Sequence, residues 1–179
     1  ENCTFRHNTA SGDGGAAYWD KKNGEISDCE FENNNAGSEG GAVYWNGANG
    51  VVTRSKFTLN NAPDGGAVYW NSQEGKLSDC EFANNTATNG GATYWNANYG
   101  TVNSSSFEDN SAQNGGAIFW HYDYGKVINS TFINNTATND GGAIYFNERG
   151  DWLDNEQESV EYSTFSENSA VNNGGAIYL

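Results

Sequence analysis

One pattern recurs about every 25 residues along the whole chain and limits the folds open to it. Seven phenylalanines are each followed three residues later by asparagine, two residues further on by alanine, and after a short turn by Gly-Gly-Ala. Successive phenylalanines lie 26, 26, 25, 25, 25 and 33 residues apart. These phenylalanines are Phe5, Phe31, Phe57, Phe82, Phe107, Phe132 and Phe165. Seven units cover residues 1–179, so we expect one repeat domain with no second domain.

Each unit reads as three short strands that wind in one direction. The first strand follows Gly-Gly-Ala, as in "AVYW"; the second ends in an aliphatic residue such as Val52; and the third contains the phenylalanine. Only two polar residues, such as Ser27 and Asp28, separate the second strand from the third, which is enough for a bend but not for a hairpin. The pattern predicts an all-β fold, a right-handed parallel β-helix of about seven coils, rising roughly 30 Å at the usual strand spacing.

Stacked coils place equivalent residues in columns, and the asparagine column predicts an internal amide ladder. In such a ladder each side chain bonds its neighbours above and below at a buried bend. An unbroken column is what a structural ladder requires, so we assign these residues a structural role and expect the phenylalanines to stack inside. The ladder residues are Asn8, Asn34, Asn60, Asn85, Asn110, Asn135 and Asn168.

Two adjacent aromatic columns must point to opposite faces of their strand. The tryptophan column, which includes Trp45, shares its face with aliphatic residues such as Val43 and is expected inside. The neighbouring column keeps a hydroxyl in six of seven coils, so we expect it to form an exposed outer stripe. Such a stripe stabilises the coil edge and is also a candidate binding surface. Its members are Tyr18, Tyr44, Tyr69, Tyr94, Phe119, Tyr145 and Tyr178.

Cysteines and carboxylates give weaker signals. Cys3, Cys29 and Cys80 share a column that serine fills elsewhere, which indicates a small inward-facing position. Cys3 and Cys29 lie in adjacent coils, so a disulfide between them is one possibility. The cysteines lack the spacing that zinc ligands require. Carboxylates recur in the column before Gly-Gly, and they leave Ca²⁺ as a weak possibility; otherwise we expect no cofactor or metal.

Composition excludes two classes of partner. The chain has 8 basic and 23 acidic side chains, a formal net charge of -15. Nucleic-acid binding depends on lysine and arginine that neutralise phosphate, so we expect no nucleic-acid partner. Docking on an anionic membrane is disfavoured for the same reason, and the sequence has no apolar run long enough to insert into a bilayer.

One coil departs from the repeat by an insertion. Residues 147–159 form an acidic insertion that contains Trp152, a further candidate binding residue outside the regular columns. An inert surface loop is the alternative for this insertion.

Both ends of the sequence match the middle of the repeat, so we expect a piece of a longer chain whose export signal and anchor lie elsewhere.

Two segments, "CEFENNNAGSEGGAVYW" (29–45) and "CEFANNTATNGGATYW" (80–95), carry a resemblance that extends over all seven units. They resemble the repeats of adhesin-like surface proteins of methanogenic archaea and of the chlamydial polymorphic outer-membrane proteins. The resemblance implies an extracellular, cell-surface or cell-wall protein that attaches to a glycan or protein of another cell, and it transfers no site residues.

Three functions therefore stay open at this point. The first is a non-enzymatic adhesin stalk or binding surface, which we favour. The second is a structural fibre built by end-to-end or lateral self-association through open coil edges. The third and weakest is a polysaccharide lyase or hydrolase, because the acidic residues are scattered along turns rather than clustered for acid-base work.

Overall fold

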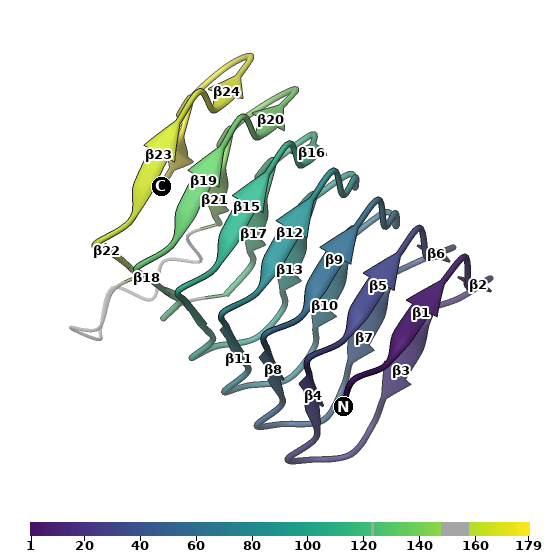
Figure 1. The fold of residues 1–179 in the computed structure, drawn as a ribbon. Coiled ribbons are helices and arrows are strands. Elements are labelled where there is room, and N and C mark those ends of the chain that lie inside the picture. The colour runs from purple at the N-terminus through teal and green to yellow at the C-terminus, as the bar shows by residue number, and fades with distance from the viewer. Residues whose placement is uncertain (123, 148–157) are drawn as a thin grey trace.

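The computed structural model describes residues 1–122, 124–147 and 158–179, and within them it shows a parallel β-helix (Figure 1). Every paired strand runs parallel to its partner in the neighbouring coil, and equivalent residues face each other in register, as in Phe5↔Phe31 and Tyr44↔Tyr69. The expected fold is confirmed. The described part of the chain contains no α-helix, and therefore no helix that could span a membrane.

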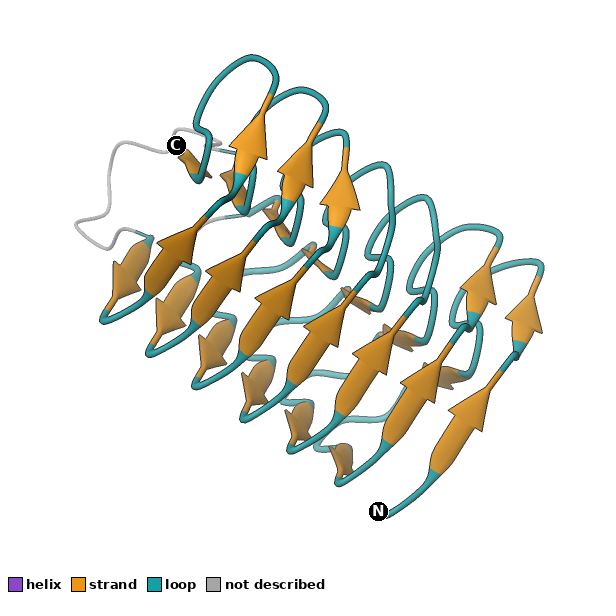
Figure 2. Cartoon of the chain, turned by 45° about the horizontal axis from the view of Figure 1, so that its top comes forward, coloured by secondary structure: helices purple, strands orange, loops and turns teal. Residues whose placement is uncertain are grey.

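Three long sheets form the walls of the solenoid (Figures 1 and 2). The phenylalanine sheet has seven strands: β1 (Thr4–Arg6), β5 (Glu30–Glu32), β9 (Lys56–Thr58), β12 (Glu81–Ala83), β15 (Ser106–Glu108), β19 (Thr131–Ile133) and β23 (Thr164–Ser166). The tryptophan sheet also has seven: β3 (Ala17–Trp19), β7 (Val43–Trp45), β10 (Val68–Trp70), β13 (Thr93–Trp95), β17 (Ile118–Trp120), β21 (Ile144–Phe146) and β25 (Ile177–Tyr178). The aliphatic sheet has six: β4 (Glu25–Ser27), β8 (Val51–Thr53), β11 (Lys76–Ser78), β14 (Thr101–Asn103), β18 (Lys126–Ile128) and β22 (Ser159–Glu161).

A fourth, two-residue strand follows the ladder asparagine in several coils, which the prediction of three strands per coil did not include. These short strands pair in two small sheets: β2 (Thr9–Ala10) with β6 (Asn35–Ala36), and β16 (Ser111–Ala112), β20 (Thr136–Ala137) and β24 (Ser169–Ala170). Isolated bridges such as Asn61↔Thr86 continue this wall between the two sheets.

Single residues in the left-handed region turn the chain at its corners. The corner between the aliphatic and phenylalanine sheets has one such residue in each coil, for example Asp28 at φ 56° and Asp79 at φ 55°. One left-handed residue is enough to turn a strand without forming a hairpin, and asparagine and aspartate tolerate it best. This explains why two polar residues suffice between adjacent strands.

The Gly-Gly pair has two separate causes. Gly40 has φ +65°, a conformation that residues with a side chain rarely adopt. Gly41 lacks a positive φ, but a Cβ there would lie 2.0 Å from the carbonyl oxygen of Gly66 in the next coil. The first glycine is therefore required by conformation and the second by the close approach of adjacent coils.

The interior is filled by stacks of rings that run the length of the solenoid. Phenylalanine rings lie 4.7 to 4.9 Å apart between centroids, and the tryptophan rings 4.8 to 5.2 Å apart, ending on Phe146 at 5.8 Å. Trp45 and Phe57 are fully buried in the main apolar core, which confirms the expected inward direction of both columns.

Candidate functional site

The tyrosine column is stacked as expected, but most of it is buried. Its ring centroids lie 4.7 to 5.4 Å apart, and the rings form a cluster separate from the main core, on the opposite face from the tryptophans. Tyr44, Tyr69, Tyr94 and Phe119 are only 4 to 8% exposed. The predicted orientation is therefore correct and the predicted exposure is wrong. Tyr145 and Tyr178 are half-buried, and Tyr18 alone in the column is largely exposed, at 53%.

Stacking and flanking side chains together remove the tyrosines from water. Each inner ring is covered on both faces by its neighbours, and His121 stacks against Tyr94 and Phe119 at 6.0 and 6.3 Å. On the other side, the Glu39 carboxyl lies close to the Tyr69 hydroxyl. Burial, with a smaller contribution from the charge of Glu39, raises the pKa of Tyr44 to about 12. A surface of this kind supports the wall and offers a ligand little contact area.

The asparagine column forms the predicted ladder, with every side-chain hydrogen-bonding group used in the central coils. Asn85 donates from Nδ2 to the Phe57 carbonyl and to Asn110 Oδ1, both at 3.0 Å. Its own Oδ1 accepts from the backbone N–H and the side chain of Asn60, at 2.9 and 3.0 Å. The same side-chain bond links each consecutive pair from Asn8 to Asn168 at 2.8 to 3.0 Å. The ladder is confirmed as a structural element.

The cysteine column is small and inward-facing, and its serines add hydrogen bonds. Ser55 Oγ donates to the Thr53 carbonyl and accepts from the Cys29 N–H, at 2.8 and 3.1 Å. All three cysteines are free thiols, with Cys3 exposed and the other two buried. Desolvation raises the pKa of the Cys80 thiol to about 12, which makes it a poor nucleophile and metal ligand.

The acidic column before Gly-Gly lies beside the tyrosines. Burial raises the pKa of Glu39, and the neighbouring charges of Asp13 and Asp64 raise it further. Further along, amides take over and bond in series, Asn89 to Asp64 at 2.9 Å and Asn114 to Asn89 at 3.0 Å. Within residues 1–122, 124–147 and 158–179, no three His, Cys, Asp or Glu side chains are arranged to hold a metal ion.

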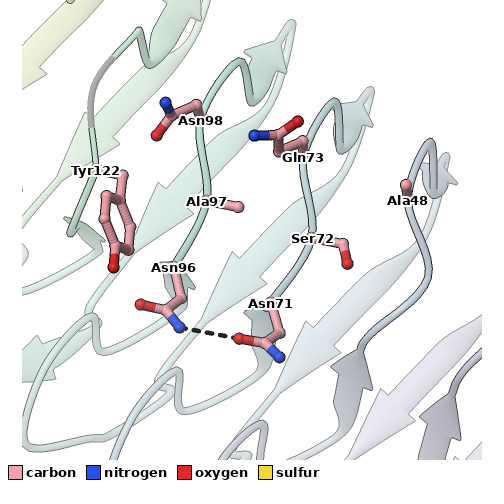
Figure 3. Close-up of a pocket in the computed structure, with 8 residues that line it drawn as sticks. All are labelled: Ala48, Asn71, Ser72, Gln73, Asn96, Ala97, Asn98 and Tyr122. Carbon is pink, nitrogen blue, oxygen red and sulfur yellow. Dashed lines mark hydrogen bonds between the residues drawn. The ribbon is translucent and has the colours of Figure 1, made fainter.

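A groove on the outer surface is the clearest candidate site (Figure 3). It has a volume of about 510 Å³ and crosses four successive coils, over the loops that link the tryptophan sheet to the aliphatic sheet. Amides bonded in series line one side of it: Asn71 donates to Asn46, and Asn96 donates to Asn71, each at 2.9 Å. The lining residues are Ala48, Asn71, Ser72, Gln73, Asn96, Ala97, Asn98 and Tyr122.

A second aromatic group lies at the apex of the same loops. Tyr99 and Tyr124 stack at 4.8 Å with their planes 6° apart, and they line a separate hollow that includes Lys126 and Glu161. Tyr99 is 46% exposed. Both tyrosines have positive φ, 63° and 66°, which is uncommon for a residue of this size.

The repeat pattern does not reveal these loop residues because they do not recur in every coil. The signal was present in the position before the loop glycine, which holds Asn23, Asn49, Glu74, Tyr99 and Tyr124 in successive coils. Asparagine suits the left-handed conformation required there, so tyrosine in two adjacent coils marks a departure from what the backbone prefers. Trp152, the other predicted binding residue outside the columns, lies outside the described residues, together with 148–157 of the predicted insertion.

Comparison with known proteins identifies the fold family. No curated protein and no solved structure matches the chain. A family model described as "right handed beta helix region" matches residues 1–179, the whole length. This agrees with the parallel coils, the stacked columns and the absence of helices among the described residues. The chain therefore belongs to the right-handed β-helix family.

Proposed function

We propose that the chain is a non-catalytic attachment surface: a stiff solenoid at the outside of a cell that binds a glycan or protein of another cell or surface. The observation that carries the proposal is the division of each coil into a repeated interior and a varied exterior. Residues that recur in every coil form the ring stacks and the amide ladder. Residues that vary lie at the outer loops, where Tyr99, Tyr122 and Tyr124 replace small or polar side chains.

This division suits recognition by a rigid scaffold. Variable loops held on a stiff framework are where binding residues usually occur. Tyrosine adds contact area and a polar tip at low cost in conformational entropy. The resemblance to adhesin-like surface proteins points the same way and supports a cell-surface location.

A second candidate is polysaccharide cleavage, and one observation favours it. Glu39 has a raised pKa and lies in a column with Asp13 and Asp64, so one carboxyl group is held protonated to higher pH beside two others. Acid-base hydrolysis of glycosides uses such a difference between paired carboxyl groups. Release of reducing ends or unsaturated sugars from polysaccharides, abolished by Glu39→Gln, would favour this candidate over attachment.

Attachment is tested with the fluorescently labelled chain on a glycan array and on a panel of whole cells. We expect saturable binding to a subset of glycans or cells, without chain shortening of the bound glycan. Absence of binding to every glycan and every cell surface would refute the proposed function. Size-exclusion chromatography with light scattering, run in parallel, would detect the self-association expected of a fibre subunit.

A further inference from the structure

The part of the loop groove's lining that the structure describes is neutral, although the chain is strongly acidic. None of the described residues that line it is charged, although the chain carries 23 acidic and 8 basic side chains. The other hollows differ in this respect: one contains Lys126 and Glu161, and another is lined by Asp28, Arg54 and Lys56 among others. A neutral lining gives no advantage to a charged ligand and avoids the cost of desolvating fixed charges when a neutral one binds.

Two side-chain amides of this groove are available to a ligand that both donates and accepts hydrogen bonds. Asn71 and Asn96 belong to the series of hydrogen-bonded amides along one side, and Ser72 donates to the Asn46 carbonyl at 2.6 Å. By contrast, neither Gln73 nor Asn98 makes a side-chain hydrogen bond to any residue of the described ranges. Figure 3 shows both amides along the same edge of the groove, in adjacent coils. Each amide offers two donors and an acceptor.

The aromatic side chains lie where the groove ends and at its rim. Tyr122 closes the row of lining residues and contacts His121 edge-on, with ring centroids 4.8 Å apart, so its ring is held in place. Tyr99 directly follows Asn98 in the chain and stacks on Tyr124 at the loop apex, where Tyr99 is exposed and Tyr124 half-buried. Both apex tyrosines have a left-handed backbone, with φ 63° and 66°, which is uncommon for a side chain of this size and points to a role in binding.

We propose that this groove is a binding site for a neutral oligosaccharide chain lying along the solenoid axis. Hydroxyl groups of the sugar form hydrogen bonds with Gln73 and Asn98, and the apolar face of a sugar ring packs on Tyr122. The apex tyrosines provide a second contact. The groove extends over three coil spacings, about 14 Å at the usual strand separation, which requires a ligand of more than one sugar unit. The inference rests on the proposed attachment function and names the site and ligand class for it.

The test uses isothermal titration calorimetry of the chain with cellohexaose, xylohexaose and mannohexaose, and with hexagalacturonate as the acidic counterpart. Two variants copy residues that the solenoid already tolerates in other coils: Tyr122→Ala matches Ala97, and Tyr99→Asn matches Asn49. The control is Tyr162→Asn, which replaces an 83% exposed tyrosine at φ 50° in a different corner and matches Asn129.

We expect the wild type to bind at least one neutral hexasaccharide. The affinity should fall about tenfold or more in Tyr122→Ala, fall less in Tyr99→Asn, and stay unchanged in Tyr162→Asn. Unfolding curves of the three variants that match the wild type would show that the fold is intact. Binding of hexagalacturonate alone, equal affinities for wild type and Tyr122→Ala, or no neutral glycan bound at all would overturn the inference. Attachment of wild type and Tyr122→Ala to cells at equal levels would refute the groove while leaving the attachment function standing; no attachment by the wild type would refute both.

Discussion

Removing one rung of the asparagine ladder provides a quantitative test of what holds the coils together. In Asn85→Ala, the backbone N–H and the side-chain amide of Asn60 lose their acceptor, and the Phe57 carbonyl loses a donor. Asn60 and Asn85 are 1% and 0% exposed, so water does not replace these partners without rearrangement. A buried polar group left without a partner costs about 1–3 kcal/mol. With two donors orphaned and a cavity left behind, we expect a loss of about 3–5 kcal/mol in the free energy of unfolding.

The matched control is Asn61→Ala, one residue along the chain from the ladder. Asn61 donates to Asn35 Oδ1 at 2.8 Å in an exposed ladder, where water can take over the hydrogen bond. We expect this variant to lose less than about 1 kcal/mol. Urea unfolding followed by far-ultraviolet circular dichroism and tryptophan fluorescence measures both, and coincidence of the two probes tests whether the solenoid unfolds in one step. A ladder variant within 1 kcal/mol of its control would refute the reasoning.

Three further predictions concern other columns. Gly66→Ala would place a Cβ 2.1 Å from the Gly91 carbonyl oxygen, so we expect its melting temperature to fall by several degrees or more while Gly12→Ala, with open space around it, stays near the wild type. The native chain should react with a thiol reagent at Cys3 alone, because Cys29 and Cys80 are buried. All three thiols should react in denaturant. Because the pKa of Glu39 is raised in the folded state, its stabilising contribution is present at low pH and is lost as the pH rises through the folded-state pKa. We therefore expect Glu39→Gln to be more stable than the wild type at neutral pH and to lose that advantage in acid. The melting temperature measured against pH tests this.

The buried columns could be predicted from sequence because they obey one rule in every coil. An unbroken series of asparagines is compatible with a stacked ladder, and the structure shows the bonds that such a series implies, from Asn8 to Asn168. The direction of the aromatic columns followed from strand geometry alone, since Tyr44 and Trp45 must point to opposite faces.

The exposure of the tyrosines could not be predicted in the same way. Direction in a strand says which face a side chain is on, but exposure depends on what covers that face. Here the rings cover one another at about the strand spacing, and the columns of Glu39 and His121 close the two sides. The candidate site was missed for a related reason, because Tyr99 and Tyr122 lie in loops where the repeat rule does not apply.

The measurement that tests the central claim most directly is the change in backbone amide NMR signals of the 19.3 kDa chain on titration with the neutral glycan that it binds most tightly. The claim is that the loops recognise the ligand while the ladders only hold the solenoid together. It predicts that shifted signals are confined to residues 71–73, 96–99, 122 and 124, and that Tyr69→Phe, which keeps the buried stack but removes its hydroxyl, binds as the wild type does. Shifts centred on the tyrosine column, or loss of binding in Tyr69→Phe, would contradict it.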